Sequence, residues 1–118
     1  MKTHIAAAFI LIATLAAQLG ASEAGKEFNE ADAQLNKVYQ RLLQTIDDSD
    51  EKDLFVSSQR AWLKFRDQSV AFFSQRYPES KGGLFYNTHL VQERTAFLQS
   101  LLSTPPDQDP EGMKPSGY

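Results

Sequence analysis

Apolar residues recur along this chain at the three- and four-residue spacing of an α-helix in three separate segments. The first segment predicts a helix that begins within residues 27–32 and ends at residues 47–49. Its expected core stripe consists of Leu35, Val38, Leu42 and Ile46, with Tyr39 and Leu43 beside it.

The second segment predicts a helix that is capped by Ser49 or Asp50. It should end before Pro78, because the residue before a proline is displaced from the α region. Its expected core stripe consists of Leu54, Ser58, Ala61, Phe65 and Phe72, with Trp62 and Phe73 beside it.

The third segment predicts a helix from residue 84 or 85 to residue 102. Its two adjacent stripes consist of Leu90, Phe97 and Leu101, and of Val91, Leu98 and Leu102. The connections between the three segments are short, and no segment alternates as a strand would. The predicted fold class is therefore all-α, a small antiparallel bundle of about three helices.

The two ends of the chain differ from this helical region. Residues 1–24 combine a basic start, an uncharged apolar run and small residues after it, which is typical of a secretory signal peptide. The run is shorter than the ~20 residues that span a bilayer, so we expect an exported protein without a permanent membrane anchor. Residues 25–104 are the expected helical domain. Residues 105–118, rich in Pro, Asp and Gly, have little to bury and are expected to be disordered.

Composition narrows the classes of partner. The formal net charge is −3, and the basic residues are not clustered as nucleic-acid binding requires, so we expect no nucleic-acid partner. A weakly acidic chain is compatible with a cationic protein partner. The chain has no Cys, so it must hold together by packing although export would permit disulfides.

No pattern in the chain predicts catalysis, a metal site or a cofactor. His89 is the one histidine outside the expected signal peptide, and a single histidine without a spaced partner is a poor metal site. The acidic run at residues 47–53 lacks the central glycine and the final glutamate of a calcium loop, so we interpret it as a solvated turn with a helix cap. Gly82 and Gly83 are interpreted as loop glycines. We expect a non-enzymatic protein.

Arg94 is a polar residue among apolar ones, since it shares a stripe with Leu90 and Phe97. Its guanidinium must reach water or meet a carboxylate, and Asp32 and Asp67 are the candidate partners for such an ion pair.

Trp62 and Arg66 lie four residues apart and can stack on one helix surface. Two interpretations stay open. Either Trp62 and Arg66 join Asp67 and Arg94 in holding the helices in register, or they form an exposed recognition patch together with Tyr39.

Three segments resemble, in order, the motifs of the LprI-like lysozyme-inhibitor family, a group of small exported bacterial domains. They are residues 32–43, which include Asp-Ala-Gln-Leu-Asn-Lys-Val-Tyr and the Leu42-Leu43 pair, residues 59–67 (Gln-Arg-Ala-Trp-Leu-Lys-Phe-Arg-Asp), and residues 93–98, with Glu-Arg-Thr and Leu98. The resemblance covers roughly residues 27–102. It departs at the cysteines: relatives commonly carry one where this chain has Ser69-Val70 and another near residues 86–90.

The resemblance implies a periplasmic or secreted binding protein that blocks the cleft of a lysozyme, a cationic enzyme with two carboxylates in its cleft. The candidate plug is the loop at residues 77–86, with Ser80, Lys81 and Tyr86 as its candidate contacts. The alternative is an envelope interaction module without lysozyme activity, which binds another envelope protein through Trp62 and its neighbours. A carrier of small ligands is disfavoured because so small a bundle leaves little room for a pocket.

Overall fold

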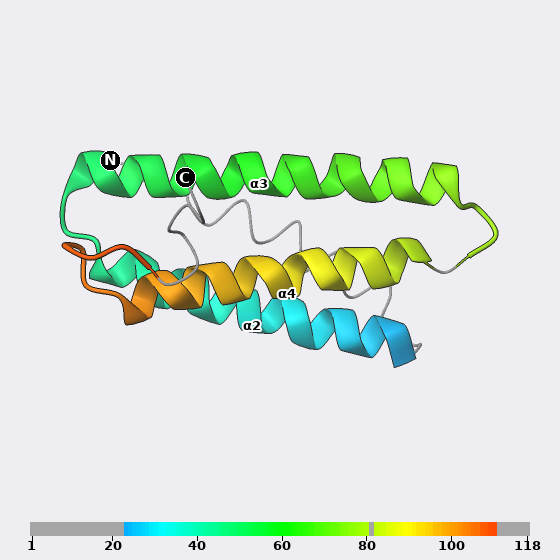
Figure 1. Ribbon diagram of the computed structural model, residues 1–118, viewed down its shortest axis with the longest axis horizontal. Coiled ribbons are helices and arrows are strands. Elements are labelled where there is room, and N and C mark those ends of the chain that lie inside the picture. Colours follow the sequence, from blue (N-terminus) through cyan, green and yellow to red (C-terminus); the bar gives the residue numbers. More distant parts are fainter. Residues whose placement is uncertain (1–22, 81, 111–118) are drawn as a thin grey trace, which may run out of the picture.

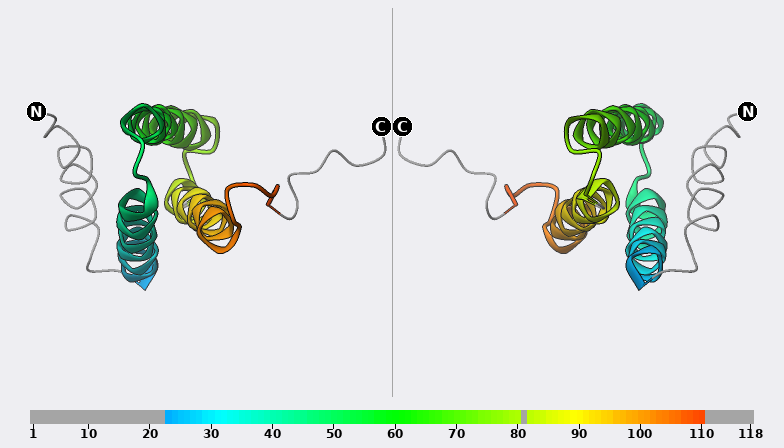
Figure 2. Two further views of the ribbon diagram at one scale, coloured as in Figure 1. Left: turned by 90° about the vertical axis from the view of Figure 1, so that its left-hand side faces the viewer. Right: turned by 90° about the vertical axis from the view of Figure 1, so that its right-hand side faces the viewer.

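Three antiparallel helices make up the part of the chain that the structure, a computed structural model, describes, namely residues 23–80 and 82–110. They are α2 (Glu23–Thr45), α3 (Ser49–Arg76) and α4 (Gly82–Ser103), and no strand occurs within those residues. Figure 1 shows α3 running beside α4 and α2, and the end-on views in Figure 2 place the three helices at the corners of a triangle. The predicted all-α bundle of three helices is confirmed.

The ends of α3 follow from local chemistry. Asp48 is its N-cap, because the Asp48 backbone is extended and its Oδ2 accepts a hydrogen bond from the Glu51 amide at 2.8 Å. The prediction of Ser49 or Asp50 as the cap is therefore wrong by one residue or two. At the other end the Tyr77 amide closes the last turn on the Phe73 carbonyl at 3.0 Å, and the helix stops before Pro78 as predicted.

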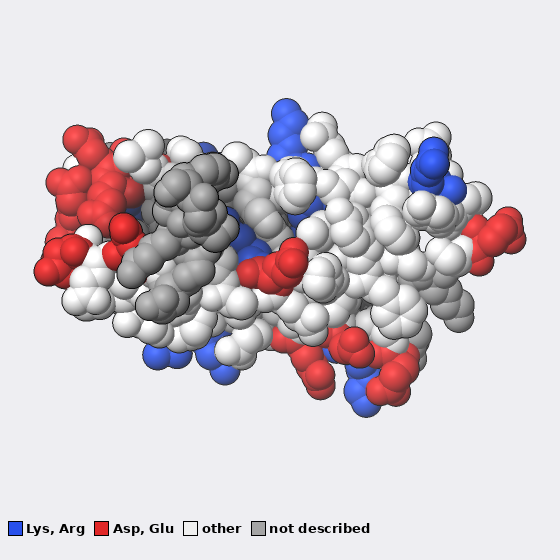
Figure 3. All heavy atoms as spheres, viewed as in Figure 1, with Lys and Arg blue, Asp and Glu red and all other residues white. Residues whose placement is uncertain are grey.

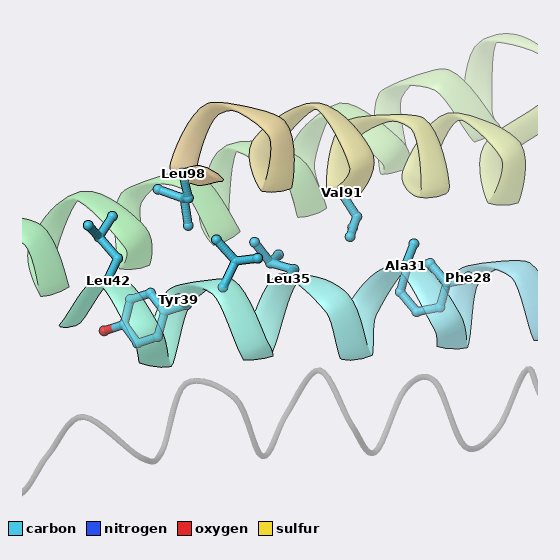
Figure 4. Close-up of a cluster of buried hydrophobic side chains, with 8 residues drawn as sticks. Phe28, Ala31, Leu35, Tyr39, Leu42, Val91 and Leu98 are labelled. Carbon is cyan, nitrogen blue, oxygen red and sulfur yellow. The ribbon is translucent and has the colours of Figure 1, made fainter. Parts of the chain in front are cut away.

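The hydrophobic core lies mainly between α2 and α4. The predicted stripe of α2 is buried along its whole length, and the side chains of Leu35 and Val38 are fully covered. From α4, Val91 and Leu98 point toward α2, and Figure 4 shows both side chains in the space between the two helices. The predicted stripes of the first and third helices are therefore confirmed as the sides that form this core.

The second helix, α3, is turned about its own axis relative to the prediction, so that a different side faces the core. Its expected core stripe faces outward: Leu54, Phe65 and Phe72 are 72%, 53% and 66% exposed, and Ser58 and Ala61 are exposed too. The opposite side of α3 turns inward, with Val56, Gln59 and Arg66 buried and with Phe55 and Trp62 packed against the core. The helix carries apolar residues on two sides, and the side rich in aromatic and polar groups is the one that packs.

The two ends of the chain extend beyond the described helices. Most of the expected signal peptide, and the last part of the expected disordered tail, lie outside the described residues, and residues 104–110 form turns after α4. Within the part of the chain that the structure describes, no helix is both long enough and apolar enough to cross a membrane.

Candidate functional site

A polar cluster lies where the three helices meet, at the inward side of α3. Arg94 of α4 donates a hydrogen bond from Nε to Gln59 Oε1 of α3 at 3.0 Å. Its guanidinium carbon also lies 5.7 Å from the centre of the Trp62 ring and 5.3 Å from that of Phe97. Arg94 thus meets an amide and two aromatic rings, and the prediction that it pairs with Asp32 or Asp67 is wrong.

Arg66 is buried beside this cluster. It stacks on Trp62, as the sequence predicted, and its guanidinium carbon lies 5.7 Å from the centre of the Trp62 ring. Its Nε and Nη2 donate to Asp67 Oδ1 at 3.1 and 2.7 Å, while the Asp67 side chain is mostly exposed. Asp67 therefore pairs with its neighbour on the same helix and joins no two helices.

Asp32 of α2 places a buried carboxyl group in the same region between the helices. It is 3% exposed, and burial raises the pKa of its carboxyl to about 6, although the positive charge of Arg66 opposes that rise. Among the described residues, Asp32 Oδ1, Gln59 Nε2 and Arg66 Nη1 are buried without a hydrogen-bond partner. The protein's own side chains therefore leave part of the hydrogen-bonding capacity of this cluster unused.

The expected recognition patch of Trp62, Arg66 and Tyr39 is not on the surface. Tyr39 is 1% exposed and stacks on Phe55, with ring centres 5.0 Å apart, and Arg66 is 3% exposed. Trp62 is half-buried, and the guanidinium carbons of Arg66 and Arg94 each lie 5.7 Å from the centre of its ring. Burial of this set favours the interpretation that these residues join helices, with Gln59 as the member that sequence reasoning missed.

The tip of the molecule between α3 and α4 has an aromatic character. The ring of Phe73 stacks on Tyr86 at 4.8 Å and contacts Tyr77 at 5.0 Å. Beside these rings an open cavity of about 480 Å³ is lined by Phe65, Gln68, Ser69, Phe72, Phe73 and Tyr86. Tyr77 and Phe85 are each more than half exposed at this tip.

The loop that forms the tip is held by Ser80. Its hydroxyl donates to the Tyr77 carbonyl at 3.2 Å and accepts from the Gly82 amide at 3.1 Å. Of the predicted plug residues, Ser80 is therefore exposed but engaged with the backbone, Tyr86 is half-buried on Phe73, and Lys81 lies outside the described residues.

Gly82 and Gly83 serve close packing of α4 on the end of α3. A Cβ added to Gly82 would lie 2.7 Å from the Phe73 ring, and one added to Gly83 would collide with the Ser74 hydroxyl. Ser69 of α3 and Tyr86 of α4 line the same cavity. The two regions in which the resemblance implies cysteines are therefore neighbours, and here a cavity lies between them.

Charge gathers at the opposite end of the molecule. Five acidic residues at the start of α3 are exposed, and Figure 3 shows red side chains collected at that end. They are Asp47, Asp48, Asp50, Glu51 and Asp53. Within the described residues, no three His, Cys, Asp or Glu side chains come together in a way that could hold a metal ion.

Comparison with known protein families gives a match over most of the chain. The model of a protein family described as "Lysozyme inhibitor LprI" matches residues 15–99 of the chain. No curated protein and no solved structure matches it.

Proposed function

The chain belongs to the LprI lysozyme-inhibitor family, and from this premise we propose that it is an exported, non-enzymatic protein that binds a lysozyme and blocks its cleft. The family match over most of the chain is the observation that carries this function. The structure adds two exposed surfaces that a lysozyme could contact, the aromatic tip and the acidic start of α3.

The aromatic tip is the contact that we assign to the cleft. Exposed aromatic residues are enriched at the energetic centres of protein interfaces, and Tyr77 and Phe85 are exposed there. Ser80 lies between them in the loop and is exposed. Lys81 follows it in the sequence and supplies a positive charge for the cleft carboxylates.

The acidic start of α3 makes a different prediction for salt dependence. It is separated from the tip by the length of α3, which for 28 residues is roughly 42 Å. Charges interact over only about 8 Å at physiological ionic strength. Docking through the tip brings one cation, Lys81, to the cleft, so it should depend less on salt than docking through the five carboxylates of the acidic end.

Titration of the exported chain against a c-type lysozyme tests the function, with binding read by calorimetry and lysis read by turbidity. We expect micromolar binding or tighter, about −8 kcal/mol, together with loss of lysis. Phe85→Ala should weaken binding by roughly tenfold, since a central interface residue contributes at least 1 kcal/mol. Leu54→Ala, which removes a similarly exposed apolar side chain at the far end of α3, is the matched control.

Two results separate the possibilities. Absence of binding at ~100 μM lysozyme, weaker than about −5.5 kcal/mol, contradicts the inhibitor function. Binding that survives Phe85→Ala but is lost in Asp50→Asn/Asp53→Asn moves the contact to the acidic end.

The alternative function is an envelope interaction module without lysozyme activity. The observation that favours it is the exposed apolar stripe of α3, since exposed apolar patches mark protein interaction sites. Retention of an envelope protein by a chain that ignores lysozyme would support this alternative.

A further inference from the structure

The outer side of α3 is apolar, although neither of the other two described helices covers it. Leu54, Phe65 and Phe72 are all more than half exposed, and Figure 2 shows α2 and α4 both on one side of α3. The inward side meanwhile buries Gln59 and Arg66. A helix that buries polar groups and exposes large apolar ones has a second side suited to burial.

The exposed stripe has the spacing of a coiled-coil seam. It consists of Leu54, Ser58, Ala61, Phe65, Gln68 and Phe72, which follow one another at intervals of four, three, four, three and four residues. All six are exposed. Such alternation keeps one seam of a helix facing a single partner helix along its length.

The seam is complementary to itself when two copies run antiparallel. With a two-fold axis at residue 63, Ala61 of one copy faces Phe65 of the other, so a small side chain meets a large one on each side of the axis. Ser58 then faces Gln68, and Leu54 faces Phe72. Every residue of the seam has a partner in this register, and the contact is isologous, as a closed dimer requires.

The cavity beside α3 fits the same register. It is lined by Phe72 and Phe65 of the seam together with Tyr86 of α4, and its volume is about 480 Å³. Phe72 is the residue that faces Leu54 of the second copy. In this register, Leu54 of the second copy therefore lies beside the cavity of the first.

Charge also favours the antiparallel direction. The acidic start of α3, including Asp50 and Glu51, comes next to Arg76 at the end of α3 of the second copy. The parallel direction would instead place the two acidic starts together. The antiparallel register has one cost, because Lys64 of each copy lies near the axis beside Lys64 of the other.

The available area suits a reversible dimer. Phe65 and Phe72, at 53% and 66% exposed, offer together roughly 240 Å² if a phenylalanine presents about 200 Å². One partner in a standard-size interface contributes about 800 Å². The two rings thus supply nearly a third, and the rest of a seam of 19 residues, roughly 28 Å long, adds further contact.

We propose that two copies of this chain associate through the outer side of α3, antiparallel and centred on residue 63, with Phe65 and Phe72 as the main contacts. This proposal goes beyond lysozyme binding and does not depend on it, because the aromatic tip is outside the seam.

Sedimentation equilibrium of the exported chain measures the association. We expect a monomer–dimer equilibrium with a dissociation constant of roughly 10–100 μM. Phe65→Glu should weaken it at least tenfold with unchanged helical circular dichroism, since the side chain is exposed in the monomer. Phe85→Ala, which removes a similarly exposed ring outside the seam, should leave it unchanged. A chain that stays monomeric at ~1 mM, or a dimer that Phe65→Glu does not weaken, overturns the proposal.

Disulfide trapping tests the direction, because the chain has no cysteine of its own. Ser58→Cys mixed with Gln68→Cys should give a disulfide-linked heterodimer, since facing seam positions lie within the reach of a disulfide. Ser58→Cys alone should give none, because in the antiparallel register its own counterpart lies ten residues, roughly 15 Å, away. Efficient linkage of Ser58→Cys to itself contradicts the antiparallel register.

Discussion

Arg94 of α4 donates a hydrogen bond to Gln59 of α3 at 3.0 Å, and this contact joins the two helices across the interior. The arginine is held further by the rings of Trp62 and Phe97. Burial lowers the pKa of the Arg94 guanidinium from its ordinary value, because a charged group is less favourable out of water. The neutral amide of Gln59 therefore accepts a hydrogen bond from the partly desolvated guanidinium of Arg94. The sequence had predicted a carboxylate as its partner.

Removing Gln59 should expose how much stability this contact supplies. We expect Gln59→Ala to lower the free energy of unfolding by roughly 2 kcal/mol, because it opens a cavity and deprives a desolvated guanidinium of its acceptor. Urea unfolding followed by circular dichroism measures the change, and Ser57→Ala on the exposed side of α3 is the control, with an expected change within about 0.5 kcal/mol. Equal values for the two variants would contradict the structural role of Gln59.

The rotation of α3 predicts very different costs for two leucines. Leu98 is fully buried between α2 and α4, whereas Leu54 is 72% exposed. Leu98→Ala should lower the free energy of unfolding by about 2–5 kcal/mol, and Leu54→Ala should change it by less than about 0.5 kcal/mol. Thermal unfolding at micromolar concentration, where the proposed dimer is dissociated, is the measurement. A large cost at Leu54 would mean that the stripe predicted from the sequence packs inward after all.

Sequence patterns predicted some features of this fold and not others for physical reasons. Helix α2 has apolar residues on one side only, so the pattern of Leu35 and Val38 identifies the side that faces the core. In α3, two sides are apolar, and spacing alone does not say which of them a helix buries. Which side of α3 is buried depends on Trp62 and Phe55. Trp62 contacts Arg94 of α4, and Phe55 contacts Tyr39 of α2.

The candidate site was predicted only in part for the same reason. The stacking of Arg66 on Trp62 follows from a spacing of four residues within one helix and is confirmed. The partner of Arg94 lies 35 residues away in sequence, and no local pattern distinguishes Gln59 from Asp67 as that partner. Tyr77 and Tyr86 were within the predicted loop, but the stacking of Tyr86 on Phe73 requires the observed arrangement of α3 and α4.

The two glycines at the start of α4 should differ in their tolerance of alanine. At Gly82 the added Cβ would press on the Phe73 ring, which is held by Tyr77 and Tyr86, so we expect a loss of roughly 1–2 kcal/mol in stability. At Gly83 the obstacle is the Ser74 hydroxyl, which can rotate away, and alanine gains about 1 kcal/mol of helix propensity. Gly83→Ala should therefore be close to neutral.

A double variant tests the cause of the loss at Gly82. Phe73→Leu removes the ring edge that the new Cβ would meet, so Gly82→Ala should cost less in that background than in the wild type. Urea unfolding of the four proteins gives the coupling. Additive losses would contradict the steric explanation.

Asp32 makes a prediction about pH with a definite sign. Burial raises the pKa of its carboxyl from 3.8 to about 6 in the folded protein, so the folded state binds the proton more tightly than the unfolded state does. The stabilising contribution is complete below pH 3.8 and is lost as the pH rises through 6. The loss by pH 7 should reach about 3 kcal/mol at most, at 1.36 kcal/mol for each pKa unit.

The variant Asp32→Asn isolates this contribution, because an amide keeps the shape of the carboxyl and does not titrate. Other acidic groups act on stability in both proteins, so the quantity to measure is the difference in free energy of unfolding between the variant and the wild type at pH 4, 5, 6 and 7. We expect that difference to grow in favour of the variant as the pH rises. Asp53→Asn, at an exposed position in the acidic start of α3, is the control for removal of a carboxylate from the surface. A difference that is constant with pH would mean that the Asp32 carboxyl titrates alike in the folded and unfolded chain, and that its burial is relieved by water.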